Sequence, residues 1–185
     1  MALALSVLVL LTALLWAGCG DGESDGPETG DAVPEARELE VRTLAHGMIS
    51  QYGRGDESAT EDETRPECEV ITRAEDLEML LKVASLQEEI PPVDLERELV
   101  LAVLQGPKRT GGYAVSVSRV TQKGSLVEVR VEVVEPEPGS ITIQILTSPY
   151  HLVTLDRDAF NPRGQLRFVF LDEQDNLLEE VLAEV

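Results

Sequence analysis

The segment from Leu126 to Val134 has the clearest alternation of apolar and polar residues in the chain. Valines occupy every second position, and the residues between them are Glu128, Arg130 and Glu132. The inward set is Val127, Val129, Val131 and Val133. Because strand side chains point alternately to two faces, this spacing predicts a strand with one buried and one solvated face.

The segments on either side of this strand also predict strands. Before it, Tyr113, Val115 and Val117 alternate with serines, and the intervening TQKG stretch predicts a hairpin turn. Further upstream, residues 99–104 are apolar at every position, which is typical of a central strand covered on both faces. Residues 39–52 alternate loosely and predict one or two strands broken near Gly47.

The region after Val134 predicts loops and strands up to the last residue. Residues 135–140 form a proline-broken loop, and residues 141–157 predict one long strand interrupted at Pro149. Residues 164–185 predict a final hairpin turning at Asp175 and Asn176. A helix is the alternative for the second half of that hairpin, because LLEEVLAEV also fits helical spacing.

One segment changes period and predicts a helix from about Arg73 to Leu86. Thr72 and Glu75 have the spacing of a capping box at its start. An apolar stripe at helical spacing follows, formed by Leu77, Leu80, Leu81 and Ala84. The predicted fold class is therefore α+β: mostly antiparallel β, as a sandwich or a partly open barrel, with one helix packed on the sheet.

The first residues are typical of a processing signal. Residues 2–17 are almost wholly apolar and end at small residues before Cys19, a pattern that resembles a bacterial lipobox. Trp16 and the lack of a basic residue before Cys19 depart from that pattern, so an ordinary cleaved signal and an uncleaved anchor remain alternatives. The prediction is a signal peptide at 1–18, a lipidated Cys19 in a disordered acidic linker at 19–37, and one β-rich domain at 38–185. The expected location is the cell envelope, on its periplasmic or surface face.

Composition excludes several classes of function. The net charge of −20 disfavours nucleic acid and anionic lipid as partners, because both require a basic surface. Cys68 begins a partly apolar run and is interpreted as a buried structural thiol, and no metal site or cofactor motif is predicted. His46 and His151 are interpreted as partly exposed sheet residues, so the chain is expected not to be an enzyme.

The stretch GPKRTGGY, residues 106–113, interrupts the apolar runs and is the candidate recognition loop. Lys108 and Arg109 are expected to form a basic tip on an acidic body. Gly111 and Gly112 are expected to supply positive φ angles. The residues proposed for partner binding are Lys108, Arg109, Thr110, Gly111, Gly112 and Tyr113 of this loop, together with Pro149 and Tyr150.

This stretch and its surroundings, about residues 69–157, resemble the C-terminal domain of the PrcB family. Thr110 to Tyr113 match its TGGY core, and Pro149 with Tyr150 match a later proline–aromatic pair. The family is named for an accessory subunit of a bacterial surface protease complex. The resemblance implies an exported accessory or binding domain without catalytic residues to carry over.

A looser resemblance connects the same residues to chagasin-type cysteine-protease inhibitors. Those proteins present a TTGY-like loop beside a proline–aromatic loop, which here would be Thr110–Tyr113 and Pro149–Tyr150. The leading hypothesis is a membrane-tethered, noncatalytic domain that binds a protein partner, with a protease among the candidates. A protease inhibitor using the same loops and a structural envelope lipoprotein are the alternatives.

Overall fold

The computed structural model describes residues 34–53, 65–86 and 89–185. The predicted signal peptide, Cys19 and the linker up to residue 33 lie outside the described residues. In chain order, the elements are β1 Arg37–Leu39, β2 Arg42–Gly47, β3 Glu67–Ile71, α1 Ala74–Ala84, β4 Glu98–Leu104, β5 Ala114–Lys123, β6 Leu126–Val134, β7 Tyr150–Asp156, the 3-10 helix Arg157–Ala159, β8 Gln165–Leu171 and β9 Leu177–Glu184.

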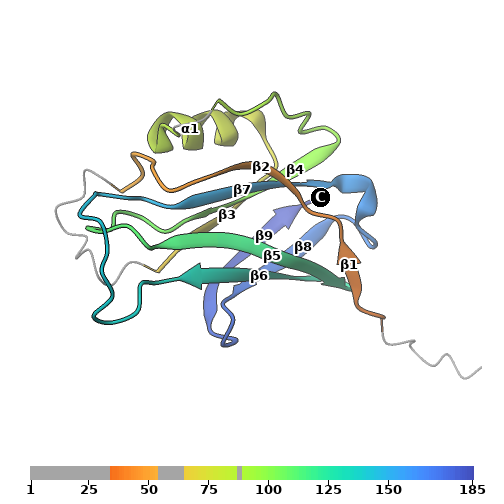
Figure 1. The fold of residues 1–185 in the computed structure, drawn as a ribbon. Coiled ribbons are helices and arrows are strands. Elements are labelled where there is room, and N and C mark those ends of the chain that lie inside the picture. Colours follow the sequence, from red (N-terminus) through yellow and green to blue (C-terminus); the bar gives the residue numbers. More distant parts are fainter. Residues whose placement is uncertain (1–33, 54–64, 87–88) are drawn as a thin grey trace, which may run out of the picture. The chain divides into compact units, whose positions relative to one another are not determined.

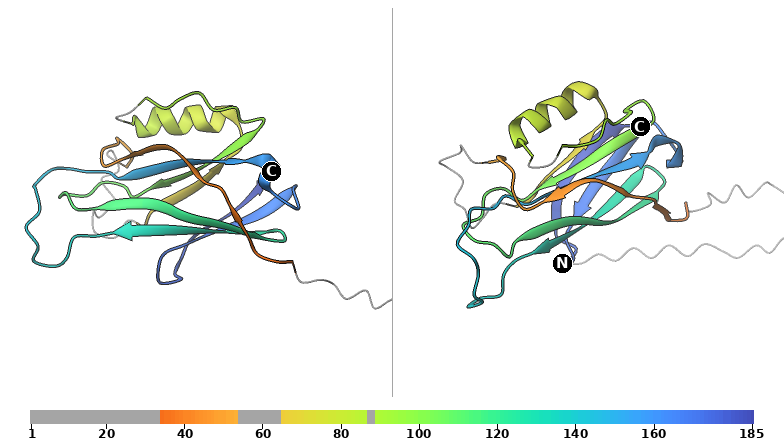
Figure 2. Two further views of the ribbon diagram at one scale, coloured as in Figure 1. Left: turned by 45° about the vertical axis from the view of Figure 1, so that its right-hand side comes forward. Right: turned by 45° about the horizontal axis from the view of Figure 1, so that its top comes forward.

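The strands form two sheets, of order β1-β5-β6-β8-β9 and β2-β7-β4-β3 (Figure 1). All neighbouring strands are antiparallel except β6 and β8, which pair in parallel. Helix α1 lies on the outer side of the four-stranded sheet (Figure 2). The predicted α+β class with mostly antiparallel strands and one packed helix is confirmed, and the sheets form a sandwich without closing into a barrel.

Strand β4 explains how the layers pack, because it is buried on both faces as its sequence predicted. Leu99, Leu101 and Val103 face the other sheet, while Val100, Ala102 and Leu104 face the helix side. Across the sandwich, the predicted valines of β6 and Phe168 and Phe170 of β8 complete the core. Against α1, the outer cluster includes Leu77, Leu80 and Ala84.

Helix α1 begins one residue later than its sequence predicted. Arg73 is the N-cap, with extended φ and ψ angles of −128° and 147°, and no side chain caps the helix. The Thr72–Glu75 capping box is therefore wrong: Thr72 ends the connection from β3, and its carbonyl accepts a hydrogen bond of 3.0 Å from Arg157 Nη2. The helix ends at Ser85, which has a left-handed φ of 42°.

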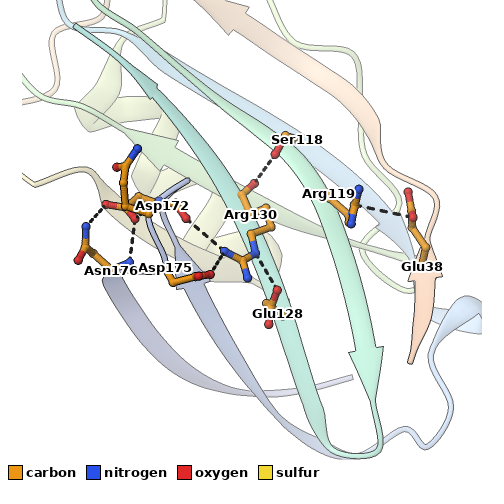
Figure 3. A network of polar contacts seen from close by, with 9 residues as sticks. Glu38, Ser118, Arg119, Glu128, Arg130, Asp172, Asp175 and Asn176 are labelled. Carbon is orange, nitrogen blue, oxygen red and sulfur yellow. Dashed lines mark hydrogen bonds and ion pairs between the residues drawn. The ribbon is translucent and has the colours of Figure 1, made fainter. Parts of the chain in front are cut away.

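The C-terminal segment is a hairpin, and the helical alternative for residues 177–185 is wrong. Strands β8 and β9 pair over their whole length, and their turn is held by Asp172 (Figure 3). The Asp172 carboxylate accepts hydrogen bonds from Gln174 N and from Asn176 N and Nδ2, and these bonds lower its pKa. Arg130 of β6 contacts this turn, donating to the Asp172 carbonyl at 3.3 Å and pairing with Asp175.

Residues 141–148 differ from their prediction as the first half of a long strand. They join neither sheet, and only Thr147 makes an isolated bridge, to Lys108. Strand β7 begins at Tyr150, immediately after Pro149. In the part of the chain that the structure describes, no helix has both the length and the apolar character needed to cross a bilayer.

Candidate functional site

The topology brings two connections together at one end of the sandwich. Residues 105–113 lead from β4 to β5, and residues 135–149 lead from β6 back to β7. Since β4 neighbours β7 in one sheet and β5 neighbours β6 in the other, both connections cross between the sheets at the same end (Figure 1). We call residues 105–113 and 141–149 the loop platform.

Backbone hydrogen bonds hold the two halves of the loop platform together. Lys108 and Thr147 exchange a pair of bonds, each of 2.8 Å between amide nitrogen and carbonyl oxygen. Gly111 N donates to the Ile143 carbonyl at 2.9 Å, and Thr147 Oγ1 donates to the Thr110 carbonyl at 3.0 Å. Because their backbone groups are paired with each other, the two segments have a defined shape, which a single loop without such a partner would lack.

The two glycines of TGGY have different physical roles. Gly112 has a φ of +95°, which confirms its predicted conformation. Gly111 does not adopt a positive φ, so that part of the prediction is wrong. A Cβ at Gly111 would lie 2.7 Å from Ile143 Cγ1, so glycine is needed there for the close approach of the second loop.

The predicted basic tip is wrong for Lys108. Its side chain is only 3% exposed, and its Nζ lies 5.2 Å from the centroid of the Tyr113 ring, in a cation–π contact. Its backbone is paired with that of Thr147, so the lysine helps to build the loop platform. Arg109 and Gly112 are exposed, whereas Thr110 and Tyr113 are partly buried.

The predicted proline–aromatic pair lies beneath the surface. Pro149 is buried and accepts a hydrogen bond of 2.9 Å from Gln105 N, while Tyr150 is fully buried in the cluster below α1. The structure therefore places the pair opposite Leu104 and Gln105, at the base of the loop platform, and does not present its side chains to solvent. In this conformation neither can contact a partner.

Sequence reasoning missed a run of exposed apolar residues in the second half of the loop platform. We call them the isoleucine ridge: Ile141, Ile143, Ile145 and Leu146. Ile141 is 103% exposed and Ile143 66%, on the segment whose alternation predicts the first half of a long strand. The sequence feature that could have indicated this exposure is the position of the apolar run between the Pro138–Gly139 turn and Pro149. In the structure this segment pairs with no neighbouring strand.

The segment from Met48 to Gly53 supports the loop platform from the side of β2. Ser50 and Ser148 are both buried, and their hydroxyl oxygens lie 2.8 Å apart. Ser148 N donates to the Met48 carbonyl at 2.9 Å, and Ser148 Oγ donates to the Tyr52 carbonyl at 3.2 Å. These contacts fix the base of the second loop directly before Pro149.

The histidine that was expected to be partly exposed, His151, is buried instead. A bulge in β5 between Val117 and Arg119 frees the Val117 amide, which donates to His151 Nδ1 at 2.9 Å. The proton of the neutral ring is then on Nε2, which lies 3.0 Å from Thr43 Oγ1 and donates to it. Burial, and then the neighbouring His46, lower the pKa of His151 to about 4. Both ring nitrogens are thus occupied structurally.

Cys68 is buried, as predicted, and carries a free thiol. Its pKa is raised to about 12, first by burial and then by the charges of Glu179 and Glu67. A thiol is a nucleophile only as the thiolate, so Cys68 is inert in this environment. Among residues 34–53, 65–86 and 89–185, no three His, Cys, Asp or Glu side chains gather in a metal-binding arrangement.

The family model described as PrcB C-terminal matches residues 99–156. That segment begins in β4 and ends with β7, so it contains the whole loop platform and the β5–β6 hairpin between its halves. The match confirms the suspected family over the TGGY region, while residues 69–98 of the predicted core lie outside it. No curated protein and no solved structure matches the chain.

Proposed function

Because residues 99–156 carry the PrcB C-terminal domain, we propose that this chain is a noncatalytic accessory subunit that binds a protein partner, a protease, through the loop platform. The observation that carries the proposal is the isoleucine ridge, four large apolar side chains exposed together on a hydrogen-bonded support. Contiguous exposed apolar residues on a soluble domain mark interaction sites.

The ridge and its neighbours have the composition of a binding centre. Ile143 is held in place by the Gly111 hydrogen bond, so little conformational freedom would be lost when a partner covers it. Exposed Arg109 lies on the same platform, and arginine is enriched among residues that dominate binding energy. The partner surface should therefore be apolar at its centre.

The inhibitor alternative is weaker because it needs the proline–aromatic loop at the surface. Pro149 and Tyr150 are buried, so the second of the two loops that the inhibitor resemblance requires is not available at the surface. We therefore propose a docking role and not occlusion of a protease active site.

The proposed attachment to a membrane through Cys19 is compatible with this role. The described chain starts at Pro34, which lies beside Gly124 in the β5–β6 turn: a Cβ built at Gly124 would be 3.4 Å from Pro34 Cγ. The loop platform is at the other end of that hairpin, about 30 Å away for strands of this length. The chain therefore enters the described domain at the end opposite the loop platform.

The test is capture of the partner by the tagged full-length protein in its native envelope. We expect a protease to be recovered with the wild type and lost when Ile141 and Ile143 are both replaced by serine. Leu182→Ser is the matched control, because Leu182 is also exposed but belongs to β9. Equal recovery with the ridge variant and with the control would refute a role for the platform, provided that all three proteins melt at similar temperatures.

A further inference from the structure

A second surface lies between α1 and the outer edge of β3, apart from the loop platform. It is a groove of about 360 Å³ with a largely apolar floor. Its apolar lining residues are Val70, Ile71, Met79, Leu80, Val83 and Val181. Met79 is 66% exposed and Val83 is 55% exposed, although both lie on the helix that covers the sheet.

Strand β3 is the edge of its sheet and pairs only with β4. In its own sheet no strand lies beyond it, and β9 of the other sheet borders the same groove through Val181. An edge of this kind accepts an added extended segment of another chain. Edge strands are usually blunted with charged residues, and here the charges are acidic only.

The rim of the groove carries three carboxylates. Glu67, Glu69 and Ile71 are two residues apart along β3 and share the face toward α1, and Asp76 lies in the first turn of the helix. Asp76 is paired with Arg73, whose Nε lies 2.8 Å from Oδ2. Within the described residues, Glu67 and Glu69 make no ion pair.

Glu69 is held in an unfavourable environment. The pKa of Glu69 is raised, first by burial and then by the charges of Glu67 and Asp76. From the packed strand β9, the charge of Glu179 acts together with that of Glu67 on the buried thiol of Cys68 and raises its pKa. Cations on the neighbouring segments include Arg65, which donates to the Leu177 carbonyl of β9. On the helix side they are Arg73, which is paired with Asp76, and Lys82 in the last turn of α1. A positive charge entering the groove would relieve this repulsion.

We propose that the α1–β3 groove binds an extended segment of a partner protein in which lysine or arginine alternates with apolar residues. The apolar side chains would cover Met79 and Val83, and the cation would lie between Glu67 and Glu69. This inference rests on residues outside the loop platform, so it stands or fails separately from the proposed function.

The probe is a blocked seven-residue peptide alternating valine and lysine, compared with the same peptide carrying glutamate in place of lysine. Binding to the wild-type protein is measured by fluorescence anisotropy, and its location by NMR shifts of assigned amides. We expect the lysine peptide alone to bind and to shift amides of α1 and β3. Affinity should fall about fivefold or more in Glu69→Gln, and further in Glu67→Gln/Glu69→Gln, which corresponds to at least about 1 kcal/mol.

Two controls separate the groove from general attraction by an acidic protein. Glu137→Gln removes one exposed charge elsewhere and should leave the affinity unchanged, whereas Val83→Ser should weaken binding without altering charge. The inference is overturned if both peptides bind equally, if Glu69→Gln behaves like Glu137→Gln, or if the shifted amides lie away from α1 and β3.

Discussion

Replacement of His151 by asparagine should remove a large part of the loss of stability that this domain undergoes on mild acidification. In the folded protein the ring is neutral, because Nδ1 accepts from Val117 N and the site is buried. The pKa of His151 is lowered to about 4, against about 6.5 in the unfolded chain. Between these values the unfolded state binds more protons than the folded state, so stability falls as the pH falls.

The size of the effect follows from the two pKa values. At pH 7.5 the histidine contributes almost nothing to the pH dependence, and at pH 5 it lowers the free energy of unfolding by about 2 kcal/mol. The loss is complete at about 3 kcal/mol once the pH is below 4. These are upper limits, since any water that reaches the ring reduces them.

The asparagine variant is chosen because its Oδ1 can replace Nδ1 as the acceptor for the Val117 amide. It loses the contact with Thr43 and should be less stable at pH 7.5 by about 1 kcal/mol. Urea unfolding of both proteins at pH 7.5 and 5 gives the comparison, and titration of the ring by NMR gives the pKa directly. His46→Asn is the matched control, because His46 is exposed in the neighbouring strand, with its ring centroid 4.7 Å from that of His151. The reasoning is refuted if the wild type and the His151 variant lose the same stability, or if the ring titrates near pH 6.5.

Three further predictions concern the platform and the anchor. Gly111→Ala should cost about 1–3 kcal/mol in urea unfolding, because its Cβ meets Ile143, while Gly139→Ala, with a φ of +83° and open space, should cost about 1 kcal/mol or less; equal costs would contradict the close approach. Ser148→Ala leaves a buried hydroxyl partner unsatisfied and should lower the free energy of unfolding by about 1–2 kcal/mol, and an unchanged value would argue against that pair. Labelled palmitate should enter the wild-type protein in bacteria and be absent from Cys19→Ala, and equal labelling would exclude lipidation at that residue.

The sequence predicted best the strands whose buried faces can be recognised from their own residues alone. The valines of β6 alternate strictly, and Val127, Val129 and Val131 are all buried. Strand β4 is apolar at each position and lies between two buried clusters. In both cases the residues of one segment are enough to define which of its faces is covered, because burial follows directly from side-chain polarity.

The predictions that failed depended on segments far away in the chain. The charge of Lys108 predicts exposure, but its backbone pairs with Thr147, about forty residues later, and the residue is buried. The alternation from Ile141 to Ile145 is typical of a strand, yet the pairing of β7 with β4 begins only at Tyr150 and Leu104, and these residues precede it without joining a sheet. Which strands pair is decided by the topology of the fold, and the polar and apolar pattern of a single segment does not reveal its neighbours.

The separation of β4 and β7 along the chain has a consequence for the order of folding. The two strands are neighbours, although the β5–β6 hairpin and both halves of the loop platform lie between them in sequence. Closing a flexible loop of about 45 residues costs roughly 3 kcal/mol in chain entropy. The hairpin, with its turn at Gly124–Ser125, needs only local contacts and is expected to close first, which shortens the remaining free chain.

The hydrogen bonds between the two halves of the platform can then form only when β7 docks beside β4. A chain that is still being synthesised, or whose second half is unfolded, would lack the ridge support and could not present Ile143 in its final position. We therefore expect the loop platform to be completed in one of the last steps of folding, so that a partner recognising it, as proposed above, would engage only fully folded molecules.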